Sequence, residues 1–220
     1  MSTETTSTSL RITEIFHSLQ GEARTAGLPT VFVRLTGCPL RCQYCDTAYA
    51  FAGGELLELS AISARVGEFS CPYVTVTGGE PLAQPNAIVL LKLLCDKGYK
   101  VSLETSGALL IDQVDDRVCI VLDVKTPGSL EADRNKYENI SYLKTSDQVK
   151  FVICDRVDYD WSKARLDQHA LVGRVDDILF SPSYGQLEPA LLAEWVLADS
   201  LKVRVQLQLH KYIWGLEPGR

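Results

Sequence analysis

Residues 31–47 read VFVRLTGCPLRCQYCDT, an apolar run followed by a loop that carries three cysteines. β-Branched and aromatic residues favour strands, so the run predicts a buried strand from Thr30 to Leu35. Cys38, Cys42 and Cys45 follow directly after it. The stretch therefore predicts a strand that delivers three closely spaced thiols to one loop.

Runs of the same kind recur along the chain and alternate with helical spacing. We expect further strands at residues 73–76, 100–103, 118–122, 148–153, 177–180 and 203–209. We expect helices at residues 56–69, 85–97, 159–171 and 189–200, with a left-handed cap at Gly98 after the second. Because a parallel crossover needs about a dozen residues, this alternation predicts an α/β fold with a parallel sheet.

Polar and glycine residues gather where several of the predicted strands end. Such loops begin at Thr36, at Thr77 (Thr-Gly-Gly-Glu-Pro), at Glu104 (Glu-Thr-Ser-Gly) and at Asp123 (Asp-Val-Lys). The carboxyl ends of parallel strands form the functional mouth of a barrel or of an open α/β sheet. We therefore expect these four loops to share one site.

The composition is that of a globular protein with a slight excess of acidic residues. The 220 residues include 22 basic and 28 acidic side chains, for a net charge of −6, and 46% are hydrophobic. This balance excludes a disordered chain and a chain that binds nucleic acid through bulk positive charge. No stretch approaches the roughly 20 apolar residues of a membrane span, and residues 1–9 do not resemble a signal peptide. We expect a mobile tail at 1–9, one domain at 10–220, a cytoplasmic location, and no nucleic-acid or membrane partner.

Three kinds of site compete for the clustered cysteines. A structural zinc site needs four closed ligands, and no fourth Cys or His lies nearby in the sequence. A disulfide would leave one thiol over and is rare in the cytosol. An iron–sulfur cluster with three thiolates leaves one iron free to bind a substrate or cofactor. The other cysteines, Cys71, Cys95, Cys119 and Cys154, stand singly in apolar surroundings and are expected to be small buried residues.

The spacing C-x3-C-x2-C, with Tyr44 just before the last cysteine, resembles the signature of the radical S-adenosylmethionine (SAM) superfamily. Thr77-Gly-Gly-Glu-Pro81 resembles the glycine-rich segment of that superfamily. The resemblance implies an α/β fold, a partial, modified (β/α) barrel. It also implies a [4Fe–4S] cluster whose open iron chelates SAM, so that one electron yields a 5′-deoxyadenosyl radical.

A narrower resemblance runs from about residue 10 to the C-terminus. Segments that resemble the 7-carboxy-7-deazaguanine synthase family lie at residues 18–22, 27–29, 32–34, 37–38, 45–47, 104–107, 123–129 and 210–215. That family is a carbon–nitrogen lyase of queuosine and 7-deazapurine biosynthesis, which converts 6-carboxy-5,6,7,8-tetrahydropterin into 7-carboxy-7-deazaguanine with loss of ammonia. The resemblance implies catalytic use of SAM, a required Mg2+, a small pterin substrate and an external one-electron reductant such as flavodoxin. The short chain and open barrel make us expect a homodimer.

The resemblance also implies a role for single residues. The cluster would be held by Cys38, Cys42 and Cys45. SAM would lie along Tyr44, Cys45, Asp46, Gly79, Glu80, Asp123, Val124 and Lys125, with the Glu80 carboxylate ordering its ammonium group. Thr47 would place its hydroxyl on Mg2+, a hard cation that takes oxygen ligands. The pterin would meet Leu19, Gln20, Gly21, Glu22, Arg34 and Thr77, and Arg34 offers a bidentate fork for its carboxylate.

The sequence departs from the family pattern at two places. Relatives often carry Ser-Pro-Lys where this chain has Asp123-Val124-Lys125, and Leu130 stands where a glycine is more common, which we expect to stiffen that loop. Two other interpretations remain at this point. A glycyl-radical-enzyme activating protein shares the size and the cysteine spacing, and a non-catalytic zinc module would share only the cysteines.

Overall fold

The computed structural model describes residues 8–219, and these contain one nine-stranded sheet. In chain order the strands are β1 Ser9–Leu19, β2 Pro29–Leu35, β3 Glu55–Glu58, β4 Tyr73–Gly78, β5 Lys100–Thr105, β6 Cys119–Asp123, β7 Gln148–Ile153, β8 Asp177–Pro182 and β9 Arg204–Val205. In space their order is β3-β1-β2-β4-β5-β6-β7-β8-β9. β1 pairs antiparallel with β2 and β3, and every pair from β2 to β9 is parallel.

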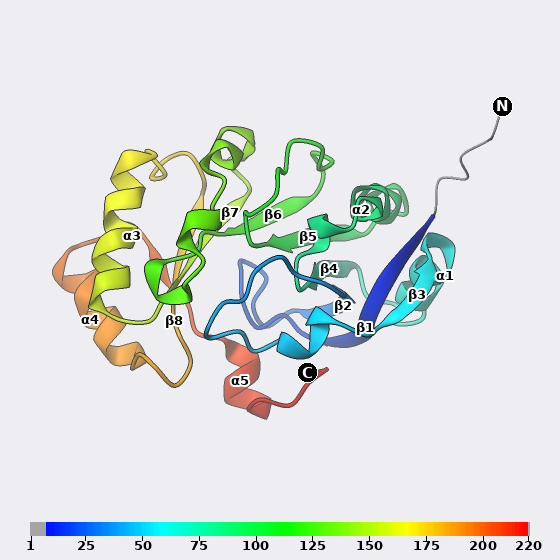
Figure 1. The fold of residues 1–220 in the computed structure, drawn as a ribbon, viewed down its shortest axis with the longest axis horizontal. Coiled ribbons are helices and arrows are strands. Elements are labelled where there is room, and N and C mark those ends of the chain that lie inside the picture. The colour runs from blue at the N-terminus through cyan, green and yellow to red at the C-terminus, as the bar shows by residue number, and fades with distance from the viewer. Residues whose placement is uncertain (1–7, 220) are drawn as a thin grey trace.

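The main helices cover the sheet in two groups. They are α1 Leu59–Gly67, α2 Asn86–Asp96, α3 Arg156–Gln168, α4 Pro189–Ala198 and α5 Leu209–Trp214. Buried side chains of α1 and α2 pack with β1, β2, β4 and β5 in one core, and those of α3 and α4 pack with β6, β7 and β8 in a second. Figure 1 shows these two groups at opposite ends of the sheet, with α5 set apart from both. None of the helices within residues 8–219 has the length and apolar character needed to cross a bilayer.

The sheet is open, because β3 and β9 end it without pairing to each other. The expected α/β class and partial barrel are therefore confirmed. Since β2 and β4 to β9 run parallel, their carboxyl ends lie on one side, as Val33 opposite Val76 and Leu103 opposite Ile120 illustrate. The loops after these strands meet there, which is where the sequence analysis placed the site.

Most of the expected elements are present, and three expectations are wrong. The helix expected at 56–69 spans only Leu59–Gly67, because residues 56–58 belong to β3, which pairs with β1. Gly98 adopts φ +85° after α2, as predicted for a left-handed cap. The strand expected at 203–209 spans only Arg204–Val205. The Gln206 N–H still donates to the Phe180 carbonyl at 2.9 Å, and its side chain bonds the backbone N–H and C=O of Ala23 at 2.7 and 2.8 Å, but α5 begins at Leu209. The expected tail at 1–9 ends too late: Ser9 already belongs to β1, while residues 1–7 lie outside the described residues.

Candidate active site

A cavity of about 490 Å³ lies at the carboxyl ends of the parallel strands. Its walls come from the end of β1, from the cysteine loop after β2, from the ends of β4 to β7 and from α5. Charged and polar groups make up much of the lining, so the cavity suits polar ligands rather than a lipid.

The three clustered cysteines line this cavity. Backbone bonds fix their loop: Cys45 N–H donates to the Cys42 carbonyl at 3.1 Å, and Leu40 N–H contacts the Cys38 sulfur at 3.4 Å. Burial raises the pKa of the Cys42 thiol to about 11 and also raises that of Cys38. Thiolates here therefore need a cationic centre beside them, as an iron–sulfur cluster would provide. Across residues 8–219, no three Cys, His, Asp or Glu side chains are grouped for a metal ion.

The glycine-rich loop after β4 packs directly against the cysteine loop. A Cβ on Gly79 would stand 2.3 Å from the Gly37 carbonyl oxygen and 2.8 Å from the Cys38 Cβ. The missing side chain therefore lets the two loops approach each other, and both loops line the cavity.

The expectation that the Glu80 carboxylate orders the ammonium group of SAM is wrong. Glu80 is fully buried and lies outside the cavity lining. Its carboxylate accepts bonds from Leu82 N–H, the Thr105 hydroxyl, and the N–H and hydroxyl of Ser106, at 2.5 to 3.0 Å. These bonds tie the loop after β4 to the end of β5, so the carboxylate is not available to order an ammonium group. Val124 is likewise a residue of the second core and does not line the cavity.

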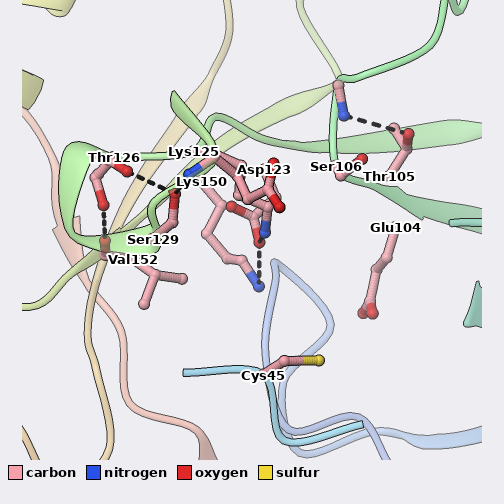
Figure 2. Close-up of polar contacts among 12 residues, drawn as sticks. Cys45, Glu104, Thr105, Ser106, Asp123, Lys125, Thr126, Ser129, Lys150 and Val152 are labelled. Carbon is pink, nitrogen blue, oxygen red and sulfur yellow. Dashed lines mark hydrogen bonds and ion pairs between the residues drawn. The ribbon is translucent and has the colours of Figure 1, made fainter. Parts of the chain in front are cut away.

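A cluster of buried charges stands opposite the cysteines. Asp123 Oδ2 lies 3.0 Å from Lys125 Nζ and 3.4 Å from Lys150 Nζ, and Lys150 Nζ lies 2.5 Å from Glu22 Oε2. Figure 2 shows Asp123, Lys125 and Lys150 gathered together on the side of the cavity facing Cys45. Burial opposes ionisation of Asp123, but the two lysines hold its pKa below the usual value. Asp123 Oδ1 is buried and has no hydrogen-bond partner among residues 8–219, so it can accept a bond from a ligand.

A second polar group lies at the ends of β4 and β5. Gln20 Nε2 donates to Glu104 Oε1 at 3.2 Å, and the Thr77 hydroxyl donates to Glu104 Oε2 at 2.9 Å. Burial, together with the nearby Glu22 carboxylate, raises the pKa of Glu104. Glu22 is different: burial opposes its ionisation too, but Lys150 and Gln208 hold its pKa below the usual value. The pocket therefore pairs an ionised carboxylate with a carboxyl that can hold a proton.

Arg34 reaches the cavity from β2, and an ion pair with Glu14 fixes its side chain. Its Nε donates to Glu14 Oε1 at 2.7 Å, and the Tyr49 hydroxyl donates to the same oxygen at 2.8 Å. The guanidinium also lies near the rings of Phe16 and Tyr49, with centroids 5.8 and 5.9 Å away. This one-sided ion pair orients Arg34 while its terminal nitrogens remain available to a carboxylate.

Thr47 lines the cavity and does not cap the turn that follows it. It precedes the short 3-10 turn Ala48–Phe51 but makes no side-chain capping bond to it. Thr47 lines the cavity, and its hydroxyl lies 3.7 Å from the Cys45 sulfur.

The α5 segment closes one side of the cavity, which the sequence analysis did not foresee. Lys211 Nζ pairs with Asp46 Oδ2 at 2.6 Å, and Leu209 N–H donates to the Gly21 carbonyl at 2.9 Å. Gly21 is also close to the His210 ring, since a Cβ there would lie 2.0 Å from Nδ1. α5 thus contacts both the cysteine loop and the loop after β1.

The structure brings together all but two of the residues singled out from the sequence. The residues that line the cavity as expected are Leu19, Gln20, Gly21, Glu22, Arg34, Cys38, Cys42, Tyr44, Cys45, Asp46, Thr47, Thr77, Gly79, Asp123 and Lys125. Sequence reasoning missed Lys150, Gln208 and Lys211, and it gave Glu104 no role. A lysine inside the otherwise apolar run of residues 149–153 was the signal that could have revealed Lys150.

Comparison with known proteins agrees with this site. Residues 32–124 match the Radical SAM superfamily. The chain is 46% identical to the 7-carboxy-7-deazaguanine synthase of Chlorobaculum tepidum, with 94% of each chain covered, and 41% identical to that of Koribacter versatilis, over 94% of this chain and 98% of the other. The crystal structure of QueE from Escherichia coli shares the fold, with a TM-score of 0.71, 22% identity and coverage of 92% of this chain and 95% of that one.

These matches favour the synthase over the activating-protein and zinc-module alternatives, and they extend well beyond the cysteine loop. On the strength of the relatives and of the cavity described above, the chain belongs to the 7-carboxy-7-deazaguanine synthase family of radical SAM enzymes.

Proposed function

We propose that the cavity at the strand ends converts 6-carboxy-5,6,7,8-tetrahydropterin into 7-carboxy-7-deazaguanine with loss of ammonia. The observation that carries this is the meeting of three thiols and the carboxyl groups of Glu22 and Glu104 around one cavity. Only a small substrate fits a space of about 490 Å³ that must also hold SAM.

Cys38, Cys42 and Cys45 would hold the [4Fe–4S] cluster, which with bound SAM supplies the one-electron chemistry that produces a 5′-deoxyadenosyl radical. The chain's own residues then have to orient the ligands and exclude water. The Gly79 backbone and the free Oδ1 of Asp123 would contact SAM, with Tyr44, Asp46 and Lys125 beside it.

The pterin would occupy the side of the cavity formed by β1, β2 and β5. Arg34 would bind its carboxylate, and Leu19, Gln20 and Gly21 would meet its ring system. An ionised Glu22 accepts hydrogen bonds from an amino group, as a 2-aminopterin ring offers. Glu104 could hold a proton at a carboxyl oxygen and deliver it as ammonia leaves, since its raised pKa keeps it protonated at higher pH than an ordinary glutamate.

Three further parts of the proposal concern the surroundings of this site. Thr47 would supply one oxygen ligand to Mg2+, a hard cation that prefers oxygen ligands. The electron would come from an external reductant such as flavodoxin. The enzyme would work in the cytoplasm as a homodimer of single-domain chains.

Anaerobic turnover tests the proposal directly. The reconstituted protein is incubated with carboxytetrahydropterin, SAM and a reductant, and the product is analysed by mass spectrometry. We expect 7-carboxy-7-deazaguanine from the native protein and from Cys119→Ala, whose thiol lies outside the cavity. Cys42→Ala should lose both iron and product. A brown, iron-loaded native protein that forms no deazaguanine would refute the proposed reaction.

A further inference from the structure

Lys150 is a buried cation in the cavity that the proposed reaction leaves without a task. It projects from β7, and 12% of its side chain is exposed. Its Nζ lies 2.5 Å from Glu22 Oε2 and 3.4 Å from Asp123 Oδ2. One ammonium group therefore touches the carboxylate assigned to the pterin and the carboxylate assigned to SAM.

We propose that Lys150 is a positioning residue that serves both ligand sites at once. Its ammonium keeps Glu22 ionised and aimed at the pterin, and it fixes Asp123 so that the free Oδ1 faces SAM. The inference rests on the proposed function, because it uses the roles given there to Glu22 and Asp123.

The charges around Lys150 support this double role. Burial acts against the charged form of Lys150, but Glu22, Asp123 and Glu104 together raise its pKa, so it stays protonated. Lys125 and Lys150 pair with Asp123 and Glu22, so two lysine cations face two carboxylates in this part of the cavity. Removing Lys150 would leave one of the two buried anions without a full partner, which is costly in a low-dielectric site.

Lys125 provides the matched comparison within the same cluster. Like Lys150 it is nearly buried and pairs with Asp123 Oδ2, at 3.0 Å, but no contact joins it to Glu22. Its ammonium instead lies 5.9 Å from the centre of the Tyr44 ring. Lys125 therefore belongs to the SAM side alone, and Lys150 alone reaches both sides.

The test measures the binding of each ligand separately, without turnover. The cluster-reconstituted, oxidised protein is titrated with SAM and, independently, with carboxytetrahydropterin. We expect Lys150→Met to weaken both by on the order of tenfold or more, as for a truncated buried charge pair. Lys125→Met should weaken SAM alone, and Lys163→Met, at the α3–α4 ion pair, should change neither. Lys150→Arg, which keeps the charge, should restore a large part of both affinities.

Two further variants keep the outcome clear. Because Lys150→Met leaves Glu22 unpaired and could unfold the protein, Glu22→Gln/Lys150→Met is titrated beside Glu22→Gln. If Lys150 positions Asp123, the double variant binds SAM more weakly than Glu22→Gln does. Equal SAM binding by the two, or a loss of one ligand only in Lys150→Met, overturns the inference. If Glu22→Gln leaves pterin binding intact, or the native protein forms no product, the fault lies in the proposed function instead.

Discussion

Replacing Gly79 by alanine should separate the glycine-rich loop from the cysteine loop. The new Cβ would meet the Gly37 carbonyl oxygen at 2.3 Å, about 1.1 Å short of the 3.4 Å at which ordinary contact begins. The opposing atoms belong to backbone and to the Cys38 Cβ, so no flexible side chain can move aside. Gly79 does not adopt a left-handed conformation, and the effect of alanine is therefore steric.

To relieve this clash, the two loops must move apart by about 1 Å, and this distance sets the size of the expected fall in rate. Both Gly79 and Glu80 are tied to the strand and loop opposite, by N–H bonds of 3.1 Å to Leu35 and 2.8 Å to Gly37. A misplacement of about 1 Å at a reacting centre costs on the order of 100-fold in rate. We expect Gly79→Ala to keep its iron while kcat/KM for SAM falls by roughly that factor.

The assay compares Gly79→Ala with Gly67→Ala under anaerobic turnover, with iron and sulfide measured on the same samples. Gly67 is the last residue of α1, and a Cβ there meets only the Tyr99 hydroxyl at 3.6 Å, an ordinary contact. Gly67→Ala should match the native enzyme. Native kcat/KM in Gly79→Ala would show that the close approach of the two loops is not needed for SAM, and the steric argument would fail.

Three other changes should give distinct results. In the native protein, Lys211 pairs with the Asp46 carboxylate and holds its pKa below the usual value. Lys211→Met leaves this buried carboxylate without its cation, so α5 should detach more easily. Hydrogen exchange in residues 209–214 should then rise by about tenfold. In the native protein this pair stabilises above the usual Asp pKa of 3.8, and the contribution disappears as the pH falls through the lowered pKa of Asp46, so exchange there should rise in acid. Thr47→Ala should keep the cluster but lose most of its response to Mg2+, and Thr47→Ser should retain it; an unchanged Mg2+ response in Thr47→Ala would remove the ligand role. Leu130, exposed and at φ +65°, costs about 1–2 kcal/mol as a left-handed residue, so Leu130→Gly should unfold at equal or slightly higher denaturant concentration, and a clear loss of stability would contradict this.

The sequence predicted the parts of the fold that depend on local pattern. The alternation of β-branched runs with helical spacing located β2 and β4 to β8, because buried parallel strands are nearly continuous in apolar residues. It missed β1, whose faces carry mixed residues such as Arg11 and His17, and it placed β3 within a helix. It also extended β9 to residue 209, where α5 begins, because alternation alone does not show where pairing with β8 stops.

The residues of the candidate site likewise fall into those that the sequence predicted and those that only the fold reveals. Residues inside the motifs, such as Cys42 and Thr47, could be assigned because their order along the chain resembles a known family. Glu80 lies in such a motif too, yet its carboxylate turned out to tie two loops together, which depends on Ser106 being in reach. Lys150 comes from outside the motifs, and Lys211 lies in the family-like segment 210–215 but had no role assigned to it; the assembled fold brings both to the cavity.

The bonds between Gln206 and Ala23 join positions 183 residues apart, and they lie beside the clasp that α5 makes on the cavity. That rim is anchored by a few polar ties, whereas the two apolar cores lie behind the strands. Local opening of α5 would consequently expose the cavity thiols to solvent and oxidants at a lower free-energy cost than unfolding of either core. Loss of activity during storage should therefore begin with opening of this rim, and the inactive protein should still show the circular dichroism of a folded chain.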